Sequence, residues 1–246
     1  MRNIKLTIEY DGKDFNGWQK QPNKLNIQGT IEKAIEAITQ EEPINLTASG
    51  RTDAGVHSLG QVANFKTNSK IPIEKMATAI NSRLKKSIVI KKAEEVDERF
   101  HSRYNCKRKT YRYIINNSKE GTAIYRGLEC HVPQKLDINS MKEAVKFFEG
   151  EHDFKAFKAS GTSSKSSVRT IYKAEVIQQG EKIFIELTGN GFLYNMVRII
   201  AGTLVDVGLG KIASEEIPEI INSMDRKRAG KTLRPHGLYL VKVEYE

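Results

Sequence analysis

Asp53 is the residue of this sequence that is best placed, by type and spacing, to take part in chemistry. It lies between Gly50 and Gly55, two positions after Arg51. Glycines permit tight turns and a close approach of a ligand to the backbone. If the chain is extended here, the side chains of Arg51 and Asp53 point the same way, and the guanidinium keeps a partly buried carboxylate ionised. Asp53 is therefore a candidate nucleophile or general acid–base.

A structural role for Asp53 is the competing interpretation. An aspartate before Ala-Gly often caps a turn or the start of a helix. Short motifs of this kind also arise by chance, so residue type and spacing leave both roles open.

The charge of the chain favours an anionic partner. Forty Lys and Arg against thirty Asp and Glu leave a formal net charge of +10 in 246 residues. Two basic segments contain no acid: His101–Tyr113, in which tyrosines are interleaved, and Arg226–His236. Basic groups neutralise phosphates and aromatic faces stack unpaired bases, which favours RNA or DNA binding over a merely solvated surface. The polar stretch 161–167 fits either an arm that contacts phosphates or a plain solvated loop.

Several classes of protein are not expected. The longest strongly apolar stretch, Val197–Leu209, is interrupted by Arg198 and Asp206, whereas a membrane span needs roughly 20 apolar residues. Two cysteines, Cys106 and Cys130, do not make a disulfide framework and indicate the reducing cytoplasm. The chain also lacks phosphate-loop, dinucleotide and metal-ligand patterns, so a metal site is not expected.

Hydrophobic periodicity predicts an α+β fold with a largely antiparallel, mixed sheet flanked by helices, because strands and helices do not alternate strictly. The patterns predict strands over 4–10, 59–67, 87–96, 109–116, 168–178, 182–188 and 238–245, and helices over 30–39, 72–84, 140–149, 192–207 and 214–224. We expect two similar packed halves. The N-terminal half, 1–104, carries the Asp53 loop, and the C-terminal half, 105–246, carries the tyrosine strand and the arginine helix.

Further motifs run in order along nearly the whole chain. They are YDG…FNGWQ from Tyr10, NIQG from Asn26, GRTDAGVH from Gly50, RFHSR from Arg99, KTYRY from Lys109, GFLYNMVR from Gly191 and HGLYL from His236. In this order they resemble the motifs of the TruA family of tRNA pseudouridine synthases. One stretch departs from the family pattern: where the family usually has TAPAHGL, this chain has TLRPHGL over 232–238. The departure concerns a loop near the active site and leaves the aspartate motif intact.

This resemblance implies the pseudouridine-synthase fold and an isomerase that acts on tRNA. Family members convert uridine to pseudouridine at positions 38 to 40 of the anticodon stem-loop. The base is detached from C1′ of its ribose, turned, and rejoined through C5, without a metal or cofactor. Family members are homodimers in which one tRNA contacts both subunits, so we expect a cytoplasmic homodimer with tRNA as its partner.

The resemblance also implies roles for individual residues. Asp53 is the catalytic nucleophile, and it attacks C1′ or C6 or supports a glycal route. Tyr111 stacks on the extruded uracil and is a candidate for removing the C5 proton, while Arg198 pairs with Asp53. Arg51 contacts RNA as the target base leaves the stack. Leu238 lines the base pocket, although a place in the strand core explains it equally well.

A catalytically inactive tRNA-binding module or RNA chaperone on the same fold is the competing function. The full set of expected catalytic and RNA-contacting residues argues against it, because a protein that only binds RNA does not need them all. A metal-dependent nuclease would need clustered carboxylates, but the acidic doublets at 41–42, 94–95 and 215–216 lie in segments that we expect to be exposed.

Overall fold

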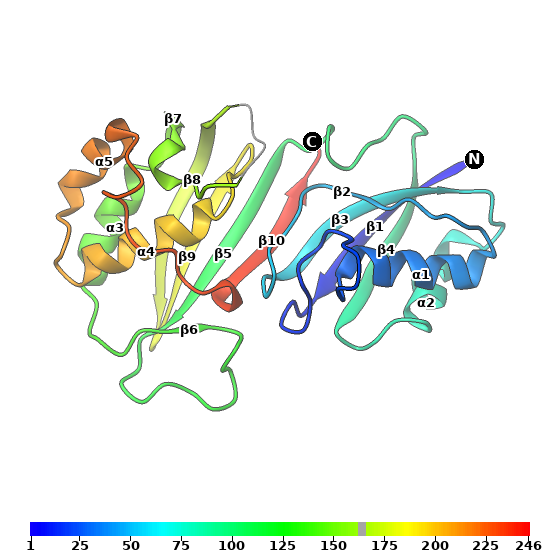
Figure 1. Ribbon diagram of the computed structural model, residues 1–246, viewed down its shortest axis with the longest axis horizontal. Helices are drawn as coiled ribbons and strands as arrows, with labels where there is room; N and C mark the ends of the chain where they lie inside the picture. Colours follow the sequence, from blue (N-terminus) through cyan, green and yellow to red (C-terminus); the bar gives the residue numbers. More distant parts are fainter. Residues whose placement is uncertain (162–165) are drawn as a thin grey trace. The chain divides into compact units, whose positions relative to one another are not determined.

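The computed structural model describes residues 1–161 and 166–246. The centre of the polar stretch 161–167 therefore lies outside the described residues, and with it the question of whether that stretch contacts phosphates. Figure 1 follows the chain through its helices and strands.

The chain divides into two compact units. The first comprises Met1–Lys107 and Tyr239–Glu246, and the second comprises Arg108–Leu238. This division differs from the expected halves, 1–104 and 105–246, at the end of the chain: the last strand, β10 (Leu238–Glu244), pairs in parallel with β3 (His57–Thr67). Residues 239–246 group with the first unit because of this pairing.

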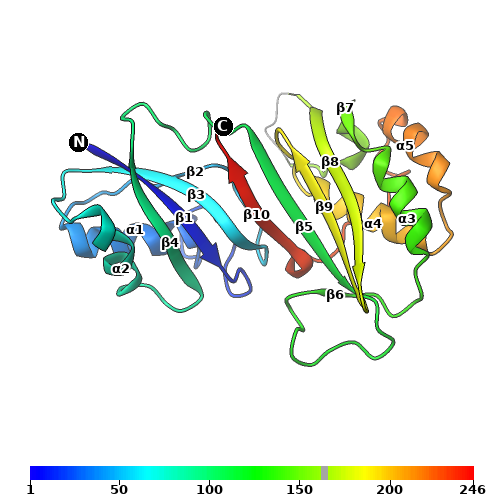
Figure 2. The same cartoon turned by 180° about the vertical axis from the view of Figure 1, so that it is seen from behind.

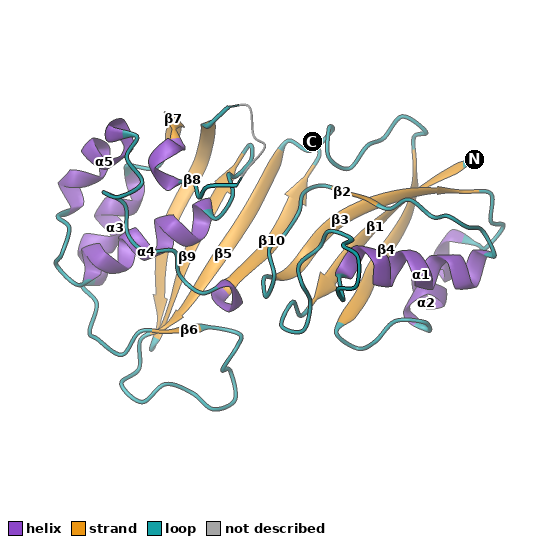
Figure 3. Ribbon diagram, viewed as in Figure 1, coloured by secondary structure: helices purple, strands orange, loops and turns teal. Residues whose placement is uncertain are grey.

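The first unit contains a mostly antiparallel sheet with the strand order β4-β1-β3-β10. The strand β1 (Arg2–Tyr10) is antiparallel to both β3 and β4 (Ile88–Val96), and the short β2 (Thr47–Ala48) pairs with β3. Every second side chain of β1 is buried, and that face packs in one apolar core with helices α1 (Ile27–Thr39) and α2 (Ile73–Asn81). Figure 3 shows both helices beside these strands.

In the second unit, neighbouring strands are antiparallel in the order β5-β9-β8-β7. Its elements in chain order are β5 (Arg108–Asn116), β6 (Cys130–His131), α3 (Ile138–Lys146), β7 (Gly150–Asp153), the 3₁₀ turn Phe154–Phe157, β8 (Val168–Gln179), β9 (Lys182–Gly189), α4 (Met196–Gly208), the 3₁₀ turn Ser214–Glu216, α5 (Ile217–Ser223) and the 3₁₀ turn Pro235–Gly237. Helix α4 lies in front of these strands in Figure 1 and behind them in Figure 2, so it covers one face of the sheet.

Two helices of the second unit start at other residues than their sequence patterns predicted. The expected helix over 192–207 begins only at Met196, because Asn195 has a left-handed backbone with φ of 61°. The expected helix over 140–149 begins earlier, at Ile138, because the side chain of Asp137 caps α3, and it ends at Lys146.

The fold class predicted from the sequence, α+β with largely antiparallel strands flanked by helices, is confirmed by both units. Among the described residues, no helix is both long and apolar enough to span a membrane.

Candidate active site

Asp53 lies in the first unit, in the loop that joins β2 to β3. The Val56 amide donates a hydrogen bond to the Asp53 carbonyl at 3.1 Å, which closes a tight turn. Gly55 has a φ of +77°, a conformation that favours glycine. Arg51 is exposed, Thr52 is buried and Asp53 is half-buried. Arg51 and Asp53 are thus more accessible to solvent than Thr52, which lies between them.

The loop after β1 packs directly against the Asp53 loop. A Cβ atom on Gly12 would lie 2.0 Å from the Val56 carbonyl oxygen, and one on Gly17 would lie 2.6 Å from that of Thr52. The amide of Trp18 donates to the same Thr52 carbonyl at 3.0 Å. Both glycines therefore serve a close backbone approach that fixes the loop on either side of Asp53.

A buried tyrosine holds the loop from the sheet side. The hydroxyl of Tyr10 lies 2.7 Å from the Thr52 hydroxyl, and Tyr10 is 2% exposed. Burial raises the pKa of Tyr10 above its ordinary value, against the opposing effect of its hydrogen bonds. The phenol therefore stays protonated and can act as a hydrogen-bond donor at neutral pH.

His57, at the end of the loop, is buried rather than poised for proton transfer in solvent. Its Nδ1 lies 3.1 Å from the Gly12 amide nitrogen and 3.1 Å from Asp11 Oδ1, and its ring stacks on Tyr239 at 4.8 Å. A neutral Nδ1 accepts from Gly12, whereas a protonated one donates to Asp11. In either state His57 ties the loop to the turn after β1.

Tyr111 lies in the second unit, on β5. It is 9% exposed, and its ring packs edge-on against Phe192 with 5.1 Å between the ring centroids. Phe192 belongs to the loop between β9 and α4, so this loop fixes the orientation of the tyrosine ring.

Arg198 projects from the first turn of α4 and is half-buried. Its Nε donates to the Leu233 carbonyl at 2.7 Å, and one terminal nitrogen donates to Asn195 Oδ1 at 2.6 Å. Both of these acceptors are neutral oxygens. Tyr111 and Arg198 are thus held by the same loop, through Phe192 and Asn195 respectively.

The segment that departs from the family pattern is held through its backbone. The Leu233 carbonyl accepts from Arg198, and the Arg234 carbonyl accepts from the Tyr113 hydroxyl at 2.7 Å. Burial raises the pKa of Tyr113 well above its ordinary value, so the hydroxyl remains a donor. Because these bonds use main-chain oxygens, they do not depend on the side chains at 233 and 234. Leu238, just beyond, is buried with 6% of its surface exposed.

The structure places the expected residues in two groups, with Arg51 and Asp53 in the first unit and Tyr111, Arg198 and Leu238 in the second. Sequence reasoning assigned no role to the positions that hold the aspartate loop, Tyr10, Gly12 and Gly17. The signal was present, because all three lie in the YDG…FNGWQ motif.

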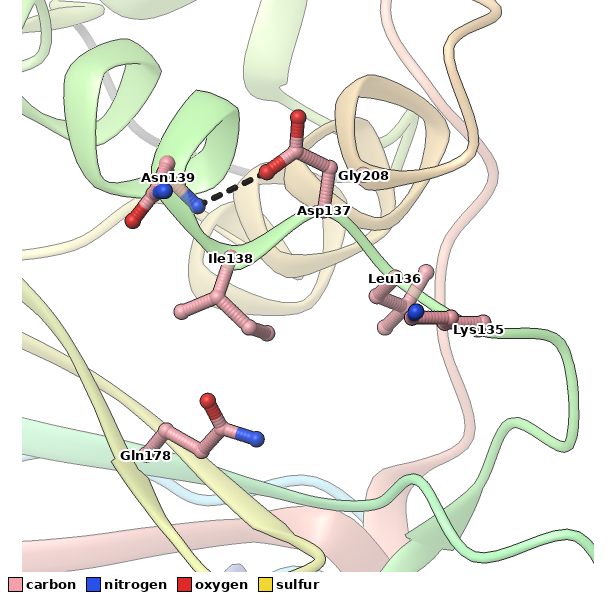
Figure 4. Close-up of a pocket in the computed structure, with 7 residues that line it drawn as sticks. All are labelled: Lys135, Leu136, Asp137, Ile138, Asn139, Gln178 and Gly208. Carbon is pink, nitrogen blue, oxygen red and sulfur yellow. Dashed lines mark hydrogen bonds between the residues drawn. The ribbon is translucent and has the colours of Figure 1, made fainter.

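The second unit also contains a pocket, but Tyr111, Arg198 and Leu238 do not line it. It has a volume of about 520 Å³ and is lined by Lys135, Leu136, Asp137, Ile138, Asn139, Gln178 and Gly208 (Figure 4). The Asp137 carboxylate already accepts the Asn139 amide at 3.0 Å as the cap of α3. Within the described part of the chain, no group of three or more His, Cys, Asp or Glu is arranged to hold a metal ion.

Comparison with known proteins shows the family of this chain. A family model described as tRNA pseudouridine synthase matches residues 6–105 and 144–246. The chain is 53% identical over 245 residues to tRNA pseudouridine synthase A of Acetivibrio thermocellus, with 100% of both chains covered. It is 54% identical over 245 residues to tRNA pseudouridine synthase A of Caldicellulosiruptor bescii, again with 100% of both chains covered.

Among solved structures, the chain is similar to one in the crystal structure of a Cbf5-Nop10-Gar1 complex. That likeness has a TM-score of 0.34 and 14% identity, and covers 94% of this chain and 56% of the other. It is too weak to bear on fold or function. The family model and the full-length relatives are sufficient by themselves: this chain belongs to the TruA family of tRNA pseudouridine synthases, which are isomerases.

Proposed function

We propose that this enzyme isomerises uridine to pseudouridine at positions 38 to 40 of the anticodon stem-loop of tRNA, with Asp53 as the catalytic nucleophile. The observation that carries the proposal is the construction of the Asp53 loop. Two glycines and the Trp18 amide contact its backbone, a buried tyrosine bonds to its Thr52 side chain, and Asp53 itself is half-buried. A carboxylate on a fixed loop suits covalent or electrostatic catalysis, because its position is set before substrate binds.

The other residues take supporting roles in this proposal. Tyr111, with its ring oriented by Phe192, stacks on the extruded uracil and takes part in removing the C5 proton. Arg198 pairs with Asp53 and keeps it ionised. Arg51, which is exposed, contacts RNA as the base leaves the stack, and Leu238 lines the base pocket. Protein contacts of this kind offset an unstacking free energy of a few kcal/mol.

The reaction requires a carboxylate that attacks the nucleotide or assists bond cleavage, and that is then released. Whether the carboxylate attacks C1′ or C6 of the nucleotide, or supports elimination to a glycal, the three routes share one need. The detached uracil must be retained while it turns, so that C5 replaces N1 at C1′. The flat face of Tyr111 supplies such a surface.

We further propose a cytoplasmic homodimer in which one tRNA contacts both subunits. Lys and Arg exceed Asp and Glu by 40 to 30, which suits binding to a polyanion. The small cysteine content, Cys106 and Cys130 in 246 residues, is too low for a disulfide framework and favours a reducing compartment. Sedimentation analysis tests the dimer, and a mass near the 27.8 kDa of one chain would contradict it.

Pseudouridine mapping on unmodified tRNA tests the reaction, the position and the nucleophile together. Purified wild-type protein and Asp53→Asn are incubated with tRNA in the absence of added metal or cofactor. We expect new pseudouridines in the 38–40 segment with the wild type only, and tRNA binding by both proteins. Binding without modification by either protein would indicate the inactive binding module instead. Modification by Asp53→Asn in a clean preparation would remove Asp53 from the mechanism.

A further inference from the structure

Gln61 is a fully buried amide on the core face of β3. It pairs across the sheet with Ile8, while Ala63 and Phe65 on the same face belong to the apolar core of the first unit. Its side chain is 0% exposed. A buried amide destabilises the fold unless its polar atoms are bonded, whereas an aliphatic residue would fill this position without that requirement. Its partners therefore indicate its role.

The partners of Gln61 are the first residues of the Asp53 loop. Its Oε1 accepts from the Ser49 hydroxyl at 2.7 Å, and its Nε2 donates to the Gly50 carbonyl at 3.0 Å. The Tyr10 hydroxyl, which bonds to Thr52, also faces the Gln61 side chain. The buried amide thus bonds to two of the four residues that lead to Asp53, and Tyr10 beside it bonds to a third.

An irregularity in the sheet sets the direction of this amide. The register of β1 and β3 shifts between Ile8 and Tyr10, so that two residues of β3 lie opposite Glu9 in a β-bulge. The Ser58 hydroxyl oxygen accepts from the Gln61 backbone amide at 2.8 Å and stabilises the bulge. Bulges beside functional sites redirect a side chain. Here the bulge lies immediately before the glutamine that contacts the loop.

We propose that Gln61 is a positioning residue for the reaction, and this rests on the proposed role of Asp53. Its amide fixes Ser49 and Gly50 to the core face of the sheet, and Tyr10 fixes Thr52 to the same network. The backbone that leads to Asp53 is therefore set by the rigid strands rather than by the loop itself. Such support is what a precisely oriented side chain on a loop requires.

The variant Gln61→Leu tests this inference, because leucine suits the apolar face but offers no partner to Ser49 or Gly50. We expect the single-turnover rate of pseudouridine formation on unmodified tRNA to fall about 10- to 100-fold, the scale expected for a small misplacement of a catalytic group. The dissociation constant for tRNA should stay near the wild-type value. Hydrogen exchange of the Val56 amide, which bonds within the loop, should become faster.

Asn64→Leu is the matched control. Asn64 is a buried amide on the opposite face of the same strand, and it binds Asn3 at 2.9 Å and the Ser102 amide at 2.9 Å instead of the Asp53 loop. It should lower the free energy of unfolding yet retain the wild-type single-turnover rate. Ser49→Ala removes the hydroxyl partner of Gln61 from the loop side and should lower the rate even if Gln61→Leu does not fold.

Each outcome separates this inference from the proposed function. A wild-type rate in folded Gln61→Leu would overturn the positioning role, while the comparison with Asp53→Asn still measures the proposed function. An equal rate loss in Asn64→Leu would also overturn it, because a general loss of stability would then explain both. If the wild type forms no pseudouridine, the proposed function fails. In that case, an unchanged rate of hydrogen exchange at the Val56 amide in Gln61→Leu would show that Gln61 does not fix the Asp53 loop.

Discussion

Gly17 approaches the backbone of Thr52 so closely that a Cβ atom at residue 17 would lie 2.6 Å from the Thr52 carbonyl oxygen. Gly17 also has a φ of +82°, which L side chains rarely adopt. The Trp18 amide that follows donates to that same oxygen at 3.0 Å. The loop after β1 and the loop that carries Asp53 are thus fitted to one another by main-chain contact, and any side chain at 17 would separate them.

We therefore expect Gly17→Ala to lower the free energy of unfolding by more than the positive φ of residue 17 alone would cost. The left-handed conformation costs about 1–2 kcal/mol for a non-glycine residue, and overpacking adds roughly 1–3 kcal/mol. Pseudouridine formation should fall as well, because the Asp53 loop shifts. Urea unfolding and a single-turnover assay measure the two effects.

Gly180→Ala is the control for that substitution. Gly180 has a φ of +60° in the turn between β8 and β9, and a Cβ atom there would meet nothing within 4 Å. Gly180→Ala should lower the free energy of unfolding only by the cost of the left-handed backbone, and it should keep the wild-type rate of pseudouridine formation. Equal losses of stability in the two variants would show that the contact with Thr52 is unimportant.

Local sequence patterns predicted the strands that frame the aspartate loop. The alternation over 4–10 corresponds to β1, and the expected strand over 59–67 lies within β3. These predictions succeed because one side of each strand must be apolar, whatever surrounds it. The loop position of Asp53 follows from its two bracketing glycines, which the same local reasoning identifies.

Features that depend on distant parts of the chain could not be predicted in this way. The start of α4 is set by the left-handed Asn195, whose side chain is bonded to Arg198. The buried position of Gln61 depends on a shift in register against β1, and no pattern within β3 reveals it. The contact of Gly17 with Thr52 joins segments that are separate in sequence. The sequence shows a glycine at position 17 in the motif, but only the structure shows that its close contact with Thr52 requires one.

Arg198 offers a test of the proposed ion pair that does not depend on activity. Arg198→Met removes the hydrogen bonds to Leu233 and Asn195, which should lower the free energy of unfolding by about 1–3 kcal/mol. If Arg198 also pairs with Asp53, a double-mutant cycle with Asp53→Asn should give a coupling free energy of about 1 kcal/mol or more. Unfolding in urea measures all four corners of the cycle.

Arg228→Met, at an arginine that pairs with a different acid, is the control for the cycle of Arg198→Met and Asp53→Asn. Arg228 lies 3.4 Å from Glu219 at the surface of the second unit. Arg228→Met should show no coupling to Asp53→Asn, because the carboxylate paired with Arg228 is that of Glu219. Additive effects for Arg198→Met would contradict the ion pair.

The cap of α3 predicts a dependence of stability on pH. The Ser140 hydroxyl, followed by the backbone amides of Ser140 and Asn139, holds the pKa of Asp137 below its ordinary value. A carboxylate whose pKa is lower in the folded state stabilises the fold above its unfolded pKa, and that contribution is lost as pH falls through the folded pKa. Asp137→Asn keeps an acceptor oxygen but does not titrate. The melting temperature of the wild type should exceed that of the variant at pH 7, and the gap should close towards pH 3. A gap that is independent of pH would contradict this account.

Tyr111→Phe separates the two roles proposed for the tyrosine. The rings of Phe192 and Tyr111 pack edge to face, with 5.1 Å between their centroids and 78° between their planes. Phenylalanine at position 111 preserves this contact and the face on which uracil stacks. The affinity for tRNA should therefore change little. Loss of a general base typically slows a reaction by about 100-fold or more, so the rate of pseudouridine formation should fall by that order if the hydroxyl takes part in removing the C5 proton. A wild-type rate in Tyr111→Phe, together with a large loss in Tyr111→Ala, would assign the residue to stacking alone and the proton transfer to another group.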